Sequence, residues 1–222
     1  MKLERVLPFA RSLLQTAVKE GDYAVDATLG NGHDTCFLAE IVGDNGKVFG
    51  FDIQKEAIES STIRLKEKEL FERTVLVHDS HDTLLSVLPE DAKGKVTGAI
   101  FNLGYLPGGD KHIVTKPNST LSAIEQLLGV MAPEGIIVLV IYHGHPEGQV
   151  ERDAVLKFAE ELDQKEAHVL RYGFINQQNN PPFIVAIEKR ESETLISEVY
   201  CPANSRIIIS TIFQIYRSFD KT

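Results

Sequence analysis

A strand that ends in an acid and runs into a glycine turn constrains the fold of this chain most. Residues 25–35 read VDATLGNGHDT, and a second run, KVFGFD at 47–52, ends in another carboxylate. In doubly wound α/β domains such glycines let the backbone approach a bound cofactor, and the acid after the second strand hydrogen-bonds its ribose hydroxyls. Together the two segments predict an adenosine-bearing cofactor at the carboxyl edge of a parallel sheet.

Short β-prone runs alternate with helical periods, which is typical of parallel strands joined by crossover helices. We predict strands at 23–28, 47–52, 74–78, 95–102, 135–142, 168–174 and 183–189, and helices at 7–19, 34–42, 54–70, 82–88, 120–131 and 151–162. A short connection joins the last two strands, which favours an antiparallel final strand. The predicted fold class is α/β, a Rossmann-like doubly wound sheet of seven strands, mostly parallel, with the last strand antiparallel. Residues 103–119 have no regular period and are predicted to form a loop, which at this length is usually functional or disordered.

Composition excludes several classes of protein. The 222 residues carry a net charge of −9, so a generally basic nucleic-acid binder is excluded and any RNA contact needs a local cluster of cations. Cys36 and Cys201 lack C-x-x-C spacing, so neither a zinc site nor a disulfide framework is predicted. The charged first residues do not begin a secretory segment, and no long apolar span follows. We therefore expect a cytoplasmic protein with no membrane partner and no metal.

The last predicted strand ends at Lys189, so the chain is divided into a domain at 1–190 and a C-terminal extension at 191–222. Residues 206–216 of the extension are apolar and β-prone. Three roles stay open for it: packing against the domain, an oligomer contact such as that of a homodimer, or an irregular extension of the reading frame. It contains no motif that indicates chemistry.

The acid–glycine turn and the segment after the fourth strand carry a resemblance to a known family. Seven strands with a terminal hairpin and an acid after each of the first two strands resemble the class I S-adenosylmethionine-dependent methyltransferases, although Thr28 and Asp34 replace the outer glycines of the family pattern. More specifically, residues 26–35 and 102–111 (NLGYLPGGDK) are similar to a bacterial group labelled as rRNA methylases and associated with tRNA wobble-uridine modification.

This resemblance covers residues 1–190 and implies an activity. The implied reaction is methyl transfer from S-adenosylmethionine to the amine of 5-aminomethyl-2-thiouridine at the tRNA wobble position, which gives the 5-methylaminomethyl form. The cofactor is then S-adenosylmethionine and the partner is tRNA. The identity of this substrate depends on the resemblance alone.

The resemblance also implies a row of cofactor-binding residues. Asp26 would reach the methionine amino group, Asp52 the ribose hydroxyls, and Asp79 the adenine amino group. The alternatives are an ordinary strand end and turn at Asp26 and a helix N-cap at Asp52. The spacing of the histidines and aspartates at 78–82 is not that of a known metal-ligand set. The full predicted set is Asp26, Thr28, Gly30, Asn31, Gly32, His33, Asp34, Thr35, Asp52, Gln54, Asp79, Ser80, His81 and Asn102.

The segment 102–107 resembles the Asn-Pro-Pro-Tyr tetrapeptide of amino-directed methyltransferases. The Asn102 side-chain oxygen would accept an N–H of the acceptor amine and aim the nitrogen lone pair at the methyl group, while Tyr105 would stack on the base. These two are the predicted catalytic residues. The predicted substrate-binding residues are Tyr105, Leu106, Pro107, Lys111, Tyr142, His143 and Arg11. For the aromatic and histidine positions a loop or turn without function stays open, and for the cations a solvated surface.

Three other functions stay open at this point. One keeps the cofactor but changes the acceptor to an rRNA base or a small-molecule amine. Another is an NAD-dependent oxidoreductase, although Thr35 stands where a dinucleotide turn has its third glycine. The third is a cofactor-binding protein without catalysis.

Overall fold

The computed structural model describes residues 2–104 and 113–191. Contacts divide the chain into two units, Met1–Ser192 and Glu193–Thr222. All of the described residues belong to the first unit. The predicted extension at 191–222 and its homodimer contact therefore lie almost entirely outside the described residues. They stay predictions, as does the cytoplasmic location. In the described part of the chain, no helix is long and apolar enough to cross a membrane.

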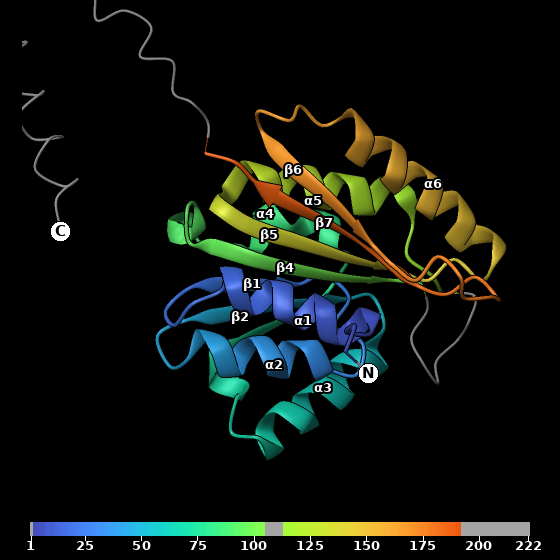
Figure 1. Ribbon diagram of the computed structural model, residues 1–222. Coiled ribbons are helices and arrows are strands. Elements are labelled where there is room, and N and C mark those ends of the chain that lie inside the picture. Colours follow the sequence, from blue (N-terminus) through green and yellow to red (C-terminus); the bar gives the residue numbers. More distant parts are fainter. Residues whose placement is uncertain (1, 105–112, 192–222) are drawn as a thin grey trace, which may run out of the picture. The chain divides into compact units, whose positions relative to one another are not determined.

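The domain is one seven-stranded sheet with strand order β3-β2-β1-β4-β5-β7-β6 (Figure 1). The strands are β1 (Tyr23–Asp26), β2 (Lys47–Asp52), β3 (Thr74–His78), β4 (Val96–Leu103), β5 (Met131–Ile141), β6 (Ala167–Tyr172) and β7 (Phe183–Lys189). Strand β7 runs antiparallel to both β5 and β6, and the pairs among β1 to β5 are all parallel. The predicted fold class is thus confirmed. Strands β2 and β3 lie on one side of β1, and the chain then crosses to the other side to form β4. Ligands bind at such a switch point in doubly wound sheets.

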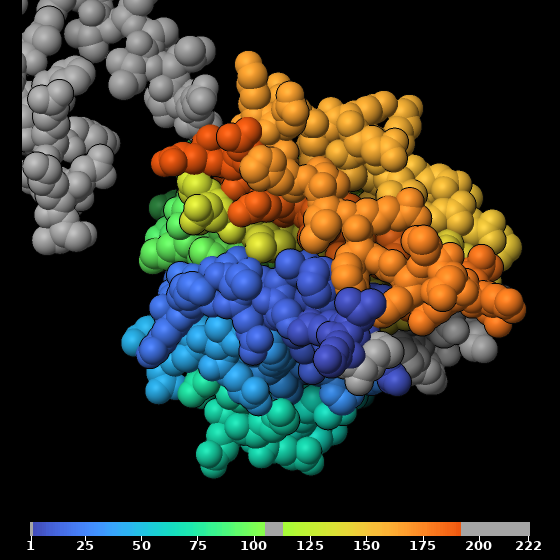
Figure 2. Space-filling view, in the orientation of Figure 1, coloured from blue at the N-terminus to red at the C-terminus, as the bar shows by residue number. Residues whose placement is uncertain are grey.

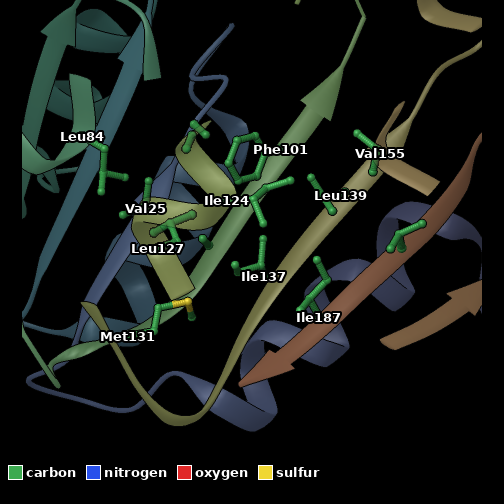
Figure 3. Packing of buried hydrophobic residues seen from close by; sticks show 14 of the residues in the cluster. Val25, Leu84, Phe101, Ile124, Leu127, Met131, Ile137, Leu139, Val155 and Ile187 are labelled. Atoms are coloured by element: carbon green, nitrogen blue, oxygen red, sulfur yellow. The ribbon is translucent and has the colours of Figure 1, made fainter. Parts of the chain in front are cut away.

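Helices cover both faces of the sheet. They are α1 (Val6–Ala17), α2 (His33–Val42), α3 (Lys55–Glu67), α4 (Leu84–Val87), α5 (Pro117–Val130) and α6 (Pro146–Glu161), with short 3₁₀ turns at Phe71–Arg73, His81–Thr83 and Glu90–Ala92. One buried apolar cluster joins α1, α2 and α3 to one face, and a second joins α4, α5 and α6 to the other. In the second, Ile124 and Leu127 of α5 lie over Phe101 and Ile137 of the sheet (Figure 3).

The N-terminal helix also reaches the far end of the sheet. Phe9 of α1 stacks on Tyr172 of β6 with 3.9 Å between ring centroids, and the Tyr172 hydroxyl donates to the Glu4 carbonyl at 2.8 Å. Figure 2 shows this as the blue N-terminal segment lying against the orange end of the β6–β7 hairpin. Two segments more than 160 residues apart are therefore packed together, which fixes α1 beside the carboxyl edge.

Two helix starts were predicted wrongly. Helix α5 begins at Pro117 and α6 at Pro146, whereas residues 103–119 were expected to be loop and the sixth helix was expected to begin at 151. In both helices the proline occupies the first turn, where its missing N–H costs no hydrogen bond and its fixed φ suits a helix. The predicted helix at 82–88 is shorter, since residues 81–83 form a 3₁₀ turn before the four-residue α4.

Candidate active site

The ends of β1, β2 and β4 and the segment after β3 open into one pocket of about 360 Å³, a volume typical of small-molecule sites. The start of α5 and the segment before it close another side. The predicted residues that line it are Thr28, Gly30, Asp52, Gln54, Asp79, Ser80, His81 and Asn102. The predicted substrate-binding residues Tyr105, Leu106, Pro107 and Lys111 lie outside the described residues, so the structure does not test them.

The glycine turn between β1 and α2 is braced by α3. Gly30 and Gly32 have φ values of 51° and 74°, a region that side chains disfavour. The Ser61 hydroxyl donates to the Gly30 carbonyl at 2.9 Å, and the Arg64 Nε donates to the Asn31 carbonyl at 2.6 Å. A Cβ atom at Gly32 would lie 2.7 Å from the Ser61 Oγ. The second glycine therefore serves both the turn and the close approach of α3.

Gly32→Ala should lower the free energy of unfolding more than Gly21→Ala does. Both positions have positive φ, at 74° and 88°, but no atom of the described residues lies within 4 Å of a Cβ built at Gly21. The matched pair separates backbone strain, which is common to both, from the clash with Ser61. We expect an extra loss of about 1–3 kcal/mol for Gly32→Ala in urea unfolding, the usual cost of overpacking. Equal losses would show that α3 yields to the added methyl group.

Asp52 joins the glycine turn to the start of α3. Its Oδ2 accepts the Gly30 N–H and its Oδ1 accepts the Gln54 N–H, both at 2.9 Å. Because both partners donate, a carboxylate satisfies them and an amide would not. Each oxygen keeps a further lone pair, and Asp52 lines the pocket. Asp52 is not the N-cap of α3, since Gln54 occupies that position, so the N-cap alternative is wrong.

Ile53 was missed by the sequence analysis. It follows Asp52, lines the same pocket and keeps 53% of its surface exposed, although isoleucine is usually buried. An apolar side chain beside an acid in the same pocket offers a surface on which a flat ring can pack. The available signal was an isoleucine directly after the strand-ending acid.

Asp26 lies beneath the pocket and is 1% exposed. Its Oδ2 accepts the Thr35 hydroxyl at 2.6 Å and its Oδ1 accepts the Thr28 N–H at 3.2 Å. Burial, followed by the negative charge of Asp34, raises the pKa of Asp26 to about 7 despite these hydrogen bonds. A cation bound close by would favour its carboxylate form. The Thr28 hydroxyl in turn accepts the Asn102 N–H at 2.7 Å, which ties β1 to β4.

The segment after β3 contributes one charged and one neutral group to the pocket. The Asp79 carboxylate accepts the Ser80 N–H at 2.8 Å. The buried His81 has its Nδ1 2.9 Å from the Ala27 carbonyl, so Nδ1 carries the hydrogen, and burial lowers the pKa of this histidine. His81 is thus neutral and supports the end of β1. Within the described ranges, no group of three or more His, Cys, Asp or Glu residues could hold a metal.

Asp34 connects three elements beside the pocket. Its Oδ1 accepts both the Nε and the Nη2 of Arg11, at 3.1 Å and 2.8 Å, and its Oδ2 accepts the Asn102 Nδ2 at 3.0 Å. Arg11, a predicted substrate contact, is therefore engaged in an ion pair. The preceding residue, His33, opens α2, and burial together with Arg64 lowers its pKa.

Tyr142 and His143 follow β5 beside the end of β4 and do not line the pocket. The Tyr142 N–H donates to the Leu103 carbonyl at 3.0 Å, and burial and the charge of Asp34 raise the pKa of its hydroxyl. His143 lies edge-on to Phe183 with ring centroids 5.4 Å apart, and burial lowers its pKa. The structure brings Tyr142 close to Asp34 and directs His143 toward β7.

A buried carboxylate that the sequence analysis missed supports the side of the pocket at the start of α5. Glu151 of α6 is 2% exposed and accepts the hydroxyls of Thr115 and Thr120, at 2.5 Å and 2.7 Å. Thr115 lines the pocket, and its hydroxyl accepts the Gly104 N–H at 3.0 Å while its own N–H donates to the Gly104 carbonyl at 3.1 Å. Glu151 thereby fixes the residues that flank Asn102.

The fold and this site define a class I S-adenosylmethionine-dependent methyltransferase. Residues 48–188 match the model of a family described as "Putative rRNA methylase". A crystal structure of a protein of that description from Clostridium thermocellum shares 43% sequence identity and a TM-score of 0.82, covering 85% of this chain and all of the other. A "putative methyltransferase" from Streptococcus mutans, solved in complex with SAH, gives 35% identity and a TM-score of 0.76 over 84% and 99% of the two chains.

A curated relative supports the same assignment. The protein named tRNA (mnm(5)s(2)U34)-methyltransferase, chloroplastic, of Arabidopsis thaliana is 36% identical over 194 residues, which span 82% of this chain and 69% of the relative. The chain belongs to the rRNA methylase family of methyltransferases, and its cofactor is S-adenosylmethionine. Asp52, which lines the pocket and keeps a lone pair on each oxygen, fits a group that presents two hydroxyls, as that cofactor's ribose does. The NAD-dependent oxidoreductase that the glycine turn left open is excluded.

Proposed function

We propose that this protein methylates the primary amine of 5-aminomethyl-2-thiouridine at the wobble position of tRNA. Asn102 carries this proposal, because it is the last residue but one of β4 and lines the same pocket as Asp52. Its amide nitrogen is already bound to Asp34, so its oxygen is left to accept an N–H of an amine. The Arabidopsis relative, whose name gives this tRNA modification, supports the same choice of substrate.

The main task of the protein in this reaction is to position the acceptor amine against the methyl group. The cofactor supplies an electrophilic methyl group on a sulfonium centre. The amine must be neutral to use its lone pair, and for a lysine-like amine this costs about 4.6 kcal/mol at pH 7. A pocket that removes water, next to a cationic sulfonium, disfavours the ammonium and lowers that cost. Asn102 then orients the nitrogen, and the methylated ammonium that forms on transfer releases its proton to water.

The other proposed contacts are assigned to the adenine, the ribose and the methionine portion of the cofactor in turn. Asp79, Ser80 and His81 would surround the adenine, Gln54 would lie beside the ribose, and the turn from Gly30 to Thr35 would face the methionine portion. Tyr105 would stack on the uracil ring. Arg11 remains a proposed contact of the RNA only through its exposed part, since its guanidinium is paired with Asp34 and its side chain is 42% exposed.

The test compares three RNA substrates with purified protein and S-adenosylmethionine: tRNA that carries the aminomethyl group, the same tRNA from cells unable to make it, and ribosomal RNA. We expect methyl incorporation on the first alone, with mass spectrometry showing 5-methylaminomethyl-2-thiouridine. Equal methylation of the two tRNAs would overturn the proposed substrate. Methylation of ribosomal RNA alone would replace it with the rRNA alternative.

A further inference from the structure

Three side chains beside the pocket, Arg11, Asp34 and Asn102, are joined by hydrogen bonds. The three residues come from α1, the first turn of α2 and the end of β4. Asp34 uses both carboxylate oxygens: Oδ1 for the two guanidinium N–H groups of Arg11, and Oδ2 for the Asn102 amide nitrogen at 3.0 Å. The Asp34 side chain is only 14% exposed and that of Arg11 is 42% exposed, so Asp34 is shielded from water while the ion pair is partly open to it.

This arrangement determines which way the Asn102 amide points. An ionised carboxylate only accepts hydrogen bonds, so the NH₂ group of Asn102 must face Asp34 and the side-chain oxygen must face away from it. The backbone of Asn102 is fixed as well, because its N–H is held by the Thr28 hydroxyl at 2.7 Å. Asn102 therefore presents an acceptor on its free side, and an acceptor is what an amine substrate needs.

We propose that Asp34 is a positioning residue of the methyl-transfer reaction: it holds the Asn102 amide with its oxygen toward the acceptor amine. This inference rests on the proposed function. Arg11 has a defined part in it, since its two N–H groups occupy Oδ1 and leave Oδ2 for Asn102. The resemblance had placed Asp34 among the cofactor contacts. That prediction stands, and the hydrogen bonds of Asp34 in the structure run to Arg11 and to the candidate catalytic asparagine.

Asp34→Asn should reverse the Asn102 amide. Arg11 presents only donors, so the oxygen of the introduced asparagine is drawn to Arg11 and its NH₂ group faces Asn102. Asn102 must then turn its own oxygen toward position 34, away from the amine. Asn102→Asp fails for another reason, because two carboxylates meet. We expect kcat for methylation of aminomethyl-bearing tRNA to fall about 100-fold in each single variant, the usual penalty for a misplaced reacting group.

The exchange variant Asp34→Asn/Asn102→Asp is the decisive protein. The introduced amide donates to the introduced carboxylate, and the second oxygen of that carboxylate faces the amine as an acceptor. We expect the exchange to recover at least about tenfold in kcat over either single variant, because residues in contact are coupled. kcat is measured at saturating S-adenosylmethionine, and calorimetry gives the cofactor affinity of each variant, so that a loss of cofactor binding is separated from a loss of rate. A residue that only braced α1 against α2, or only bound the cofactor, would show no such recovery.

A second pair keeps the inference testable if the exchange variant does not fold. Removing the guanidinium in Arg11→Ala/Asp34→Asn frees the oxygen of the introduced asparagine to face Asn102, so this protein should be faster than Asp34→Asn alone. Single variants with wild-type kcat, or neither combination faster than Asp34→Asn, would overturn the inference while wild-type activity on aminomethyl tRNA stands. Absence of that wild-type activity would instead refute the proposed function.

Discussion

Asp52→Ala should weaken S-adenosylmethionine binding by about 10²–10⁴-fold. The two oxygens of Asp52 each keep a lone pair toward the pocket after accepting the N–H groups of Gly30 and Gln54. Two ribose hydroxyls bound there make charge-assisted hydrogen bonds worth about 1.5–3 kcal/mol each. Their joint loss, at 1.4 kcal/mol per tenfold, gives the stated range. Isothermal titration of the cofactor into the purified variant measures it.

The turn itself also depends on Asp52, so the measurement needs a matched control. Asp44→Ala removes the same charge from the turn that precedes β2, where Asp44 is 86% exposed and paired with Arg73 at 2.6 Å. It should leave cofactor affinity unchanged. Thermal melting of both proteins without cofactor shows how much of the effect comes from a loosened turn. If Asp52→Ala bound the cofactor within tenfold of wild type, the ribose would have to be held by other residues.

The sheet could be predicted because its signals are local. A β-prone run that ends in an acid and a glycine turn identifies strand, turn and helix within about a dozen residues, and the topology of parallel strands brings their carboxyl ends to one edge. That is why Asp52 and Asn102, 50 positions apart in the sequence, could be assigned to one site. The starts of α5 and α6 were missed because Pro117 and Pro146 were taken as loop residues, although proline also begins helices.

The polar interior of the site could not be predicted because its partners are distant in sequence. Glu151 meets Thr115 and Thr120 across 36 and 31 residues, and although it lies one helical turn before the buried Val155, the sequence does not indicate its partners. Likewise Arg11 looks like any helical cation until the fold places Asp34 against it, 23 residues away. Sequence patterns indicate which residues reach the edge of the sheet, and packing determines which of them pair.

The burial of Asp26 makes the stability of the folded protein depend on pH. Its pKa rises from 3.8 to about 7 through burial and the neighbouring Asp34, so the folded protein holds a proton that the unfolded chain releases. For a carboxyl group with a raised pKa, the native state binds more protons between the two pKa values, and stability therefore falls as pH rises through that window. The contribution is most favourable below about pH 4 and reaches its full deficit above about pH 7. A bound ammonium group beside Asp26 would offset that deficit.

Asp26→Asn should therefore flatten the pH dependence of stability. Between pH 5 and 8 the wild-type free energy of unfolding should fall by about 2–3 kcal/mol more than that of the variant, from the linkage between those pKa values. The amide can still accept the Thr28 N–H and can donate to the Thr35 hydroxyl, so the variant keeps both hydrogen bonds. Urea unfolding of the cofactor-free proteins at several pH values measures the difference. Parallel curves for the two proteins would mean that Asp26 is ionised throughout this range in the cofactor-free protein.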